Sequence, residues 1–287
     1  MPYLSPVAVR LGNADNRPGG AALRADGVSA GYRGTPVVHD ASVRLTGGRV
    51  TVLIGPNGSG KSTLLRTMAA LHPAMKGRIG FPDGARVSDL PPRELARRVT
   101  LLSQHRPTPG GVTVREVVAY GRHPHQPRWG GRDPEGPAIV ERAMALTGVT
   151  ALATRPVDGL SGGQLQRVWL ASCLAQDTPL LLLDEPTTFL DLRYQVELLD
   201  IVRDLADRDG IAAGLVLHDL DQAAAIADEV VLLVGGRVAA AGPPAEVMTP
   251  ELLSSAYGIQ VDVHRDPDSG LLHTRARARH HRRLTTR

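Results

Sequence analysis

The sequence predicts an α/β domain built on a largely parallel sheet, with an antiparallel β subdomain near its N-terminal end and an inserted α-helical subdomain. Three observations lead to this fold class. An apolar run, Val50 to Ile54, precedes a glycine-rich loop and a helical pattern. A second run, Leu180 to Leu183, has the continuous hydrophobicity of a central parallel strand. The stretch between them changes to helical periodicity, which indicates an insertion between two parts of one core.

Length and composition are those of a globular protein. The chain has 287 residues, of which 42% are hydrophobic, so it can bury a substantial core. Its single cysteine, Cys173, excludes an intramolecular disulfide framework and fits a reducing compartment. Residues 1–20 have no signal-peptide pattern and are expected to be a flexible lead-in. Because no apolar run reaches the roughly 18 residues of a membrane helix, we expect a cytoplasmic protein unless a partner holds it at a membrane.

Positive charge is concentrated at the C-terminal end. The formal net charge is +4, and arginines and histidines crowd the last residues, so we expect 266–287 to be a solvated basic tail. A basic chain raises the possibility of nucleic-acid binding. Charge runs at termini are usually solvated, however, and no specific nucleic-acid partner is expected.

The first folded segment reads as antiparallel strands. Between residues 21 and 45, short alternating stretches are broken by Gly31, Gly34 and Pro36, as in strands joined by tight turns. Tyr32 lies in the first turn. Its ring is either a half-buried turn aromatic or a face on which an adenine ring could stack, and its position alone leaves both open.

The glycine-rich loop that follows has the pattern of a phosphate-binding P-loop. Glycines let backbone N–H groups approach phosphate oxygens, and the helix behind the loop points its positive end at the same anion. Lys61, one of only two lysines in the chain, would reach the β- and γ-phosphates, and the Ser62 hydroxyl would bind Mg²⁺. The predicted nucleotide-binding residues are Gly55, Pro56, Asn57, Gly58, Ser59, Gly60, Lys61, Ser62 and Thr63.

Beyond the P-loop helix, the pattern continues with short elements and then the insertion. Two short strands are expected near 78–87, a helix around 93–97 and a strand over 99–103 that ends at Gln104. Residues 105 to about 178 carry helical stripes and form the predicted inserted subdomain. Within it, the Gly- and Pro-rich stretch 121–137 is expected to be an exposed loop.

The core then resumes. A helix is expected over 192–205, a strand over 211–217, a helix over 220–227 and a hairpin around Gly235 and Gly236. Two short helices should follow Pro243.

Two acidic residues stand directly behind the second apolar run. Asp184 and Glu185 are placed where magnesium-dependent hydrolysis of a nucleotide needs carboxylates, at the carboxyl end of a strand. Asp184 would hold the Mg²⁺ shell, and Glu185 would polarise the attacking water. An acidic pair alone is more often a surface edge, but here a P-loop precedes it.

A second helix start has the chemistry of an anion site. Ser161 stands at the N-cap position of a helical stretch, followed by the N–H groups of Gly162 and Gly163 and by Gln164. The sequence therefore predicts two phosphate sites in one chain.

Taken together, these motifs resemble an ATP-binding-cassette (ABC) ATPase, a P-loop NTPase with a RecA-like core, over residues 21–265. The resemblance is carried by Tyr32, the P-loop, Gln104, Leu160 to Gln164, Leu180 to Glu185, Asp191 and His218 in their order and spacing.

The resemblance implies a role for each of these residues. Tyr32 would stack on adenine, Gln104 and His218 would sense the γ-phosphate beside Glu185, and Gln104 would also approach the metal. Asp191 would contact the partner subunit at its nucleotide. Ser161 and Gly163 would bind the ATP held by a second copy of the chain, which gives a head-to-tail dimer around two nucleotides.

Finer features resemble one group of importer ATPases. The stretches 93–97, 117–125 and 185–191 are similar to those of ATPases serving iron–siderophore, haem and cobalamin uptake. Such proteins dock on separate membrane permeases at the inner face of the cell membrane and serve a substrate-binding protein indirectly. Arg122 and His123 are the predicted permease-facing residues. A cassette for another transported substrate and a soluble cassette acting on nucleic acid or ribosomes remain the alternatives.

Overall fold

The computed structural model describes residues 21–103, 110–126, 132–188 and 190–277. Its centre is a six-stranded sheet. Neighbouring strands are parallel except for the last pair, which is antiparallel. The order across the sheet is β5 (Val99–Leu102), β6 (Leu180–Asp184), β7 (Ala212–Val216), β3 (Val50–Ile54), β8 (Glu229–Val234) and β9 (Arg237–Gly242). Every residue of β3, β6 and β7 is buried, as expected for strands covered on both faces.

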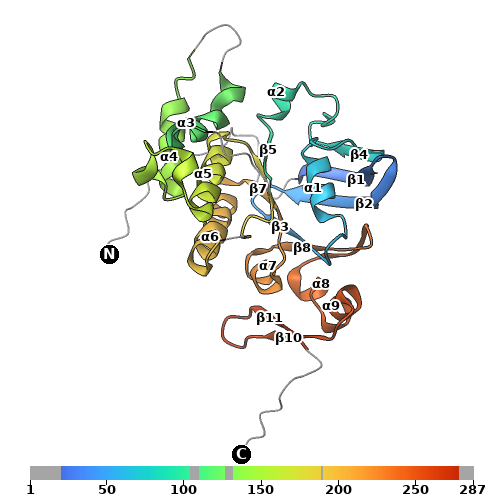
Figure 1. Ribbon diagram of the computed structural model, residues 1–287. Helices are drawn as coiled ribbons and strands as arrows, with labels where there is room; N and C mark the ends of the chain where they lie inside the picture. Colours follow the sequence, from blue (N-terminus) through green and yellow to red (C-terminus); the bar gives the residue numbers. More distant parts are fainter. Residues whose placement is uncertain (1–20, 104–109, 127–131, 189, 278–287) are drawn as a thin grey trace, which may run out of the picture.

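A separate antiparallel sheet lies beside this core (Figure 1). It has the order β2 (Thr35–Thr46), β1 (Ala21–Tyr32) and β4 (Lys76–Gly80). The β1–β2 turn places Arg33 and Gly34 at positive φ, the backbone of a tight two-residue hairpin. Helix α1 (Lys61–Met68) packs between the two sheets through Leu64, Leu65 and Met68.

The inserted subdomain is helical, as predicted. It contains α3 (Val114–Ala119), the 3-10 turn η1 (Tyr120–His125), α4 (Gly136–Leu146), the turns η2 (Thr150–Leu152) and η3 (Val157–Gly159), and α5 (Gly162–Ala175). A reciprocal cap between Thr113 and Glu116 starts α3. The short α2 (Pro92–Leu95) precedes β5, outside this subdomain.

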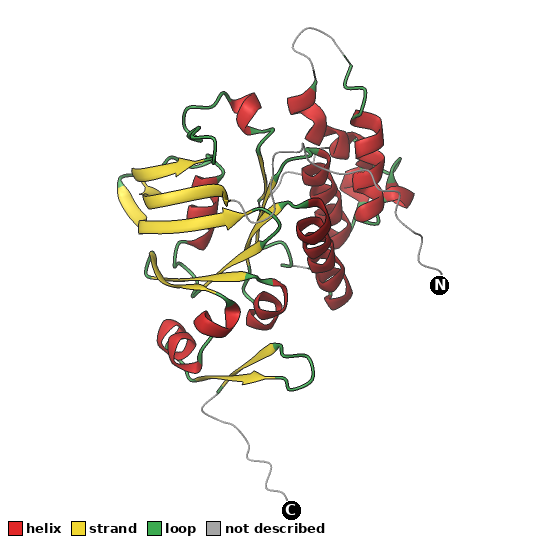
Figure 2. Ribbon diagram, turned by 180° about the vertical axis from the view of Figure 1, so that it is seen from behind, coloured by secondary structure: helices red, strands yellow, loops and turns green. Residues whose placement is uncertain are grey.

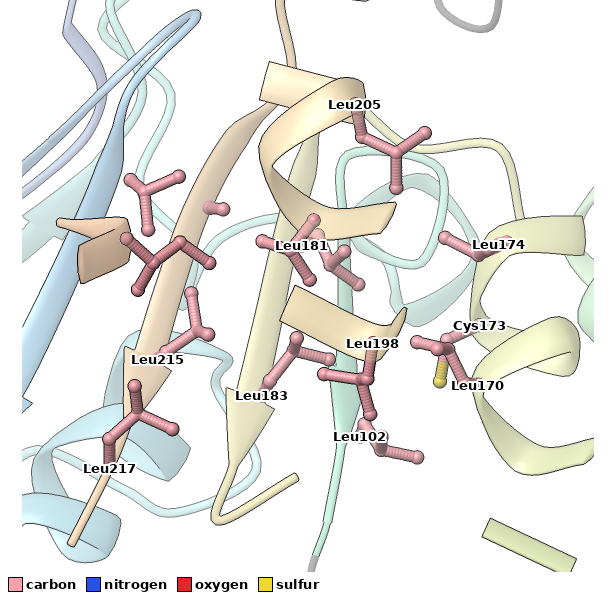
Figure 3. Close-up of a cluster of buried hydrophobic side chains, with 14 of the residues drawn as sticks. Leu102, Leu170, Cys173, Leu174, Leu181, Leu183, Leu198, Leu205, Leu215 and Leu217 are labelled. Carbon is pink, nitrogen blue, oxygen red and sulfur yellow. The ribbon is translucent and has the colours of Figure 1, made fainter. Parts of the chain in front are cut away.

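The helical subdomain joins the core through leucines. Leu170 and Leu174 of α5 meet a cluster that includes Leu102, Leu181 and Leu183 of the sheet (Figure 3). Helix α6 (Leu192–Asp209) covers the same strands through Leu198 and Leu205. Cys173 is buried in this cluster and acts there as a small apolar residue.

The C-terminal part is more structured than predicted. It contains α7 (Leu220–Ile226), α8 (Pro244–Val247), α9 (Pro250–Tyr257) and an antiparallel hairpin of β10 (Val261–Arg265) and β11 (Leu272–Ala276), which lies at the lower end of the molecule in Figure 2. Residues 266–276 therefore do not form the expected tail. The Asp221 carboxylate on α7 accepts hydrogen bonds from the Thr274 amide and hydroxyl, both at 2.7 Å, and fixes β11.

The confirmed fold class is an α/β P-loop core with an antiparallel β subdomain and a helical insertion. The lead-in 1–20 and residues 278–287 of the basic tail lie outside the described residues. Among the helices that the structure describes, none combines the length and hydropathy needed to cross a membrane.

Candidate nucleotide-binding site

The P-loop joins β3 to α1 in a backbone that only glycine allows at two points. Gly55 has φ 141°, and a Cβ there would lie 2.0 Å from the Leu233 carbonyl oxygen. Gly60 has φ 94°, and a Cβ there would lie 2.9 Å from Val38. Gly60 is also the N-cap of α1 and offers no side chain to cap it. The first N–H groups of α1 are therefore left to an external acceptor, which is the requirement of a phosphate site.

Lys61 is buried inside this loop. Its side chain is 5% exposed, and Nζ donates hydrogen bonds to the carbonyl oxygens of Gly55 at 2.7 Å and Pro56 at 3.0 Å. Burial lowers the pKa of Lys61, whereas the charges of Glu185 and Asp184 act in the opposite direction. Among the residues that the structure describes, the direct partners of the ammonium are neutral carbonyl oxygens, and a phosphate anion would compensate its burial better.

Asp184 ends β6 and is 1% exposed. Its Oδ2 accepts hydrogen bonds from Arg66 of α1, at 3.1 Å from Nη2 and 3.3 Å from Nε. Its Oδ1 is buried and has no hydrogen-bond partner within the described parts of the chain. An orphaned carboxylate oxygen at the end of a strand is the kind of ligand, direct or through water, that Mg²⁺ takes. Asp184 therefore fits the predicted metal site.

Glu185 has an unusual backbone. Its φ is +54°, a left-handed conformation that non-glycine residues rarely adopt, and its amide donates to the Val216 carbonyl at 3.2 Å. Nε2 of His218 lies 2.6 Å from Glu185 Oε1, so the imidazole donates to the carboxylate. His218 follows β7, directly before the cap of α7. The structure thus brings the two residues together at the edge where β6 and β7 end, and backbone strain there is typical of functional sites.

The second predicted anion site forms a closed cap. The Ser161 hydroxyl accepts from the Gln164 amide at 3.3 Å, and Gln164 Oε1 accepts from the Ser161 amide at 3.1 Å. Both residues belong to the start of α5, together with Gly162 and Gly163. Ser161 and Gly162 are exposed.

The two predicted anion sites start on opposite faces of the central sheet. Leu180 and Leu182 of β6 pack with α1, whereas Leu181 and Leu183 pack with α5. Alternate residues of a strand point to opposite faces, so α1 and α5 flank the sheet from two sides, as Figures 1 and 2 also show. One chain therefore presents its P-loop and its Ser161 segment at separate places.

The remaining predicted residues occupy the periphery. Asp191 is exposed and caps α6 by accepting from the Tyr194 amide at 3.1 Å. Tyr32 ends β1 with 48% of its surface exposed, which leaves its ring available to a ligand. Gln104 lies outside the described residues.

Sequence reasoning missed three residues at this site. Arg66 pairs with Asp184, the Tyr257 hydroxyl of α9 accepts a hydrogen bond from the Gly55 amide at 3.1 Å, and His72 packs against Tyr32. Burial raises the pKa of the Tyr257 hydroxyl, so it stays neutral. Arg66 carries a weak local signal, since it lies on the helix that starts at Lys61. Tyr257 carries none, because it is 202 residues from Gly55.

The prediction that Arg122 lies on a partner surface is wrong. Its side chain is buried, and its guanidinium donates to Asp133, with Nε 2.7 Å from Oδ2, and to the Ala175 carbonyl at 3.0 Å. A Gly- and Pro-rich stretch suggested exposure, but an ion pair with a further backbone acceptor makes burial of the guanidinium possible. His123, its neighbour, is exposed as predicted.

Known proteins resemble the chain closely. The family profile described as "ABC transporter" matches residues 38–188. The ferric enterobactin transport ATP-binding protein of Escherichia coli is 44% identical over 253 residues, which cover 87% of this chain and 92% of that protein. The hemin import ATP-binding protein of Streptomyces coelicolor is 46% identical over 257 residues, which cover 89% and 90%.

Solved structures agree with these sequence matches. A structure described as an inward-facing metal-chelate type ABC transporter matches 90% of this chain and 98% of its own, with a TM-score of 0.78 and 25% identity. Both kinds of comparison extend well beyond the P-loop. The chain therefore belongs to the ABC transporter family, of which it is an ATP-binding subunit and an ATPase.

Proposed function

We propose that this chain is the ATP-hydrolysing subunit of an importer that moves an iron–siderophore or a related metal complex through a separate membrane permease. The proposal of ATP hydrolysis is supported by one observation. The P-loop holds Lys61, and the acidic residues close to it are Asp184 and Glu185, the second of which pairs with His218. The cargo class rests on relatives named for ferric enterobactin and hemin. The chain would work at the inner face of the membrane and would not touch the cargo.

The P-loop would hold the triphosphate of ATP. Lys61 would exchange the carbonyls of Gly55 and Pro56 for phosphate oxygens, while the N–H groups that open α1 donate to the same anion. Mg²⁺, when bound with the nucleotide, screens negative charge between its phosphates. Ser62, Asp184 and Gln104 are the residues proposed to hold it.

Glu185 would orient and deprotonate the attacking water. The carboxylate is only partly exposed, and the 2.6 Å hydrogen bond from His218 holds its Oε1 in a fixed orientation. His218 would report the presence of that phosphate through the same contact. This division matches the roles that the family resemblance implies for both residues.

The working unit would be two copies of the chain. Because α1 and α5 start on opposite faces of the sheet, the Ser161–Gln164 segment would complete the P-loop site of a second copy. Ser161, Gly162, Gly163 and Gln164 would then contact the partner's nucleotide, and Asp191 would lie at the interface. ATP would bring the copies together, and hydrolysis would release them.

A groove supports docking of a permease. It has a volume of about 610 Å³ and lies between the end of α1, α2 and the helical subdomain. Its lining includes Leu71, Val87, Leu95, Tyr120 and Trp169, and Leu71 is 67% exposed. A groove with this mostly apolar lining would receive a short helix from a cytoplasmic loop of the permease. The exposed His123 on η1 is the remaining predicted contact at this side.

The catalytic proposal is tested by Glu185→Gln. This isosteric change keeps the packing but removes the base, so we expect ATP binding to persist, hydrolysis to fall by at least about 100-fold and a closed dimer to accumulate with ATP. Turnover by the assembled transporter and dimer formation by light scattering are the measurements. Wild-type turnover in this variant would remove Glu185 from the catalytic role.

The transport proposal is tested by partnership and uptake. The chain should co-purify with a membrane permease, and its loss should abolish uptake of ferric siderophore, haem or cobalamin when each is supplied separately in labelled form. The complex that is no longer taken up identifies the cargo. Loss of uptake of a free metal ion alone would favour another transported substrate, and recovery with ribosomes or DNA would contradict import.

A further inference from the structure

Tyr32, at the edge of the candidate site, is supported from one side by a histidine that belongs to no recognised motif. The rings of Tyr32 and His72 lie with centroids 4.6 Å apart and an interplanar angle of 40°. Nε2 of His72 lies 2.8 Å from the Gly31 carbonyl oxygen. A carbonyl only accepts, so this nitrogen carries the proton and the imidazole orientation is fixed.

The Gly31 carbonyl that His72 contacts lies in a rigid part of the backbone. Gly31 pairs with Pro36 across the β1–β2 hairpin, and a Cβ on Gly31 would lie 2.0 Å from the Thr35 carbonyl oxygen. The backbone therefore has little room to move at the carbonyl that His72 contacts. An exposed tyrosine on a turn normally samples several rotamers, and a ring packed against one side restricts that freedom. The other side of the Tyr32 ring remains open to a ligand.

His72 also ties this aromatic pair to the phosphate loop. It follows α1 closely, and the Leu71 amide still bonds to the Arg66 carbonyl at 2.9 Å. The same helix begins at Lys61 in the P-loop. One rigid element thus sets the separation between the phosphate end, at its N-terminus, and the aromatic ring held just beyond its C-terminus.

We propose that His72 is a positioning residue that holds Tyr32 as a one-sided platform for the base of a purine nucleotide, at a distance from the P-loop fixed by α1. The inference rests on the proposed function, because it assumes that Tyr32 receives the base of the bound ATP. His72 itself does not touch the nucleotide. It acts by reducing the freedom that Tyr32 would lose on stacking.

The distinguishing experiment separates the base from the phosphates. Binding of ATP and of inorganic tripolyphosphate to the purified chain is measured for wild type, His72→Ala, His72→Phe and Tyr32→Ala. We expect His72→Ala to weaken ATP by about 5-fold, within the range of base–aromatic stacking, and to leave tripolyphosphate unchanged. His72→Phe keeps a ring against Tyr32 and should recover most of the affinity for ATP.

Two further readouts exclude a merely structural effect. In the assembled transporter, His72→Ala should raise KM for ATP with kcat unchanged, because the γ-phosphate site is not altered. The double variant with Tyr32→Ala should bind ATP no more weakly than Tyr32→Ala alone, because both act on one platform. Additive losses would overturn the inference.

Each remaining outcome overturns the positioning role of His72, either alone or together with the proposed function. Equal weakening of ATP and tripolyphosphate by His72→Ala would mean that α1 is disturbed, and would overturn the positioning role. An effect of Tyr32→Ala without one from His72→Ala would also overturn it but leave the proposed function intact. A wild-type chain that binds neither probe would refute the proposed function and this inference together.

Discussion

Helices α1 and α5 both begin with glycine-rich segments, yet their N-termini differ in what they leave unsatisfied. Helix α1 starts at Gly60 without a side-chain cap, and the buried Lys61 stands among backbone oxygens beside two acidic residues. Helix α5 starts with Ser161 and Gln164 satisfying each other's backbone, at the exposed surface. A helix dipole alone is thus not sufficient for a site. In the proposed function, these surroundings would let the first N-terminus bind an anion within one chain, whereas the second would bind one only on a partner copy.

Among these variants, Lys61→Ala should reduce ATP affinity the most. Removing the charged donor from the P-loop should weaken ATP binding by about 10- to 100-fold, since a hydrogen bond to a charged group contributes more than a neutral one. Isothermal titration calorimetry on the isolated chain measures it. Lys76→Ala is the matched control, because it removes the chain's other lysine, on the exposed start of β4. Equal ATP affinity in both variants would contradict the assignment of the P-loop.

Ser161→Ala should affect dimer formation rather than ATP binding by the single chain. ATP binding to the single chain should be unchanged, whereas the ATP-dependent dimer formed in a Glu185→Gln background should weaken by about 10-fold through loss of one hydroxyl contact. The loss of a helix cap also costs about 1 kcal/mol of stability. Thr113→Ala controls for that, because it removes the equivalent cap of α3. Equal loss of dimer in both variants would assign the effect to helix stability rather than to a partner's nucleotide.

Features that depend on neighbouring residues could be predicted from the sequence. Ser161 opens a helical stretch, and Asp184 and Glu185 come after a continuous apolar run, so local pattern was sufficient to place both at the ends of elements. The core order of strands and helices follows from periodicity for the same reason. Such features depend on neighbours in the chain rather than on the final packing.

Contacts between distant segments could not be predicted in this way. Arg66 meets Asp184 across 118 residues, so its place on α1 gives only a weak signal of that contact. Arg122 was expected at the surface because its loop is rich in Gly and Pro, but Asp133 and a backbone carbonyl stabilise it inside. Strand β11 was not predicted, because its residues continue into the basic C-terminal stretch. Its position depends on the hydrogen bond from Thr274 to the distant Asp221 of α7.

Tyr257→Phe is expected to have the smallest effect on ATP binding. It tests whether the P-loop needs its contact with the C-terminal helix α9 to hold the anion-binding conformation. The variant removes the hydroxyl that accepts from the Gly55 amide at 3.1 Å and leaves the ring in place. A neutral hydrogen bond contributes about 0.5–1.5 kcal/mol, so ATP affinity should fall by roughly 2- to 10-fold while the Ser161-dependent dimer contact is preserved. Tyr120→Phe, which alters an exposed tyrosine of η1, is the control. Unchanged ATP affinity with reduced unfolding free energy would show that Tyr257 stabilises the fold and that β3 and α1 alone hold the loop in its anion-binding form.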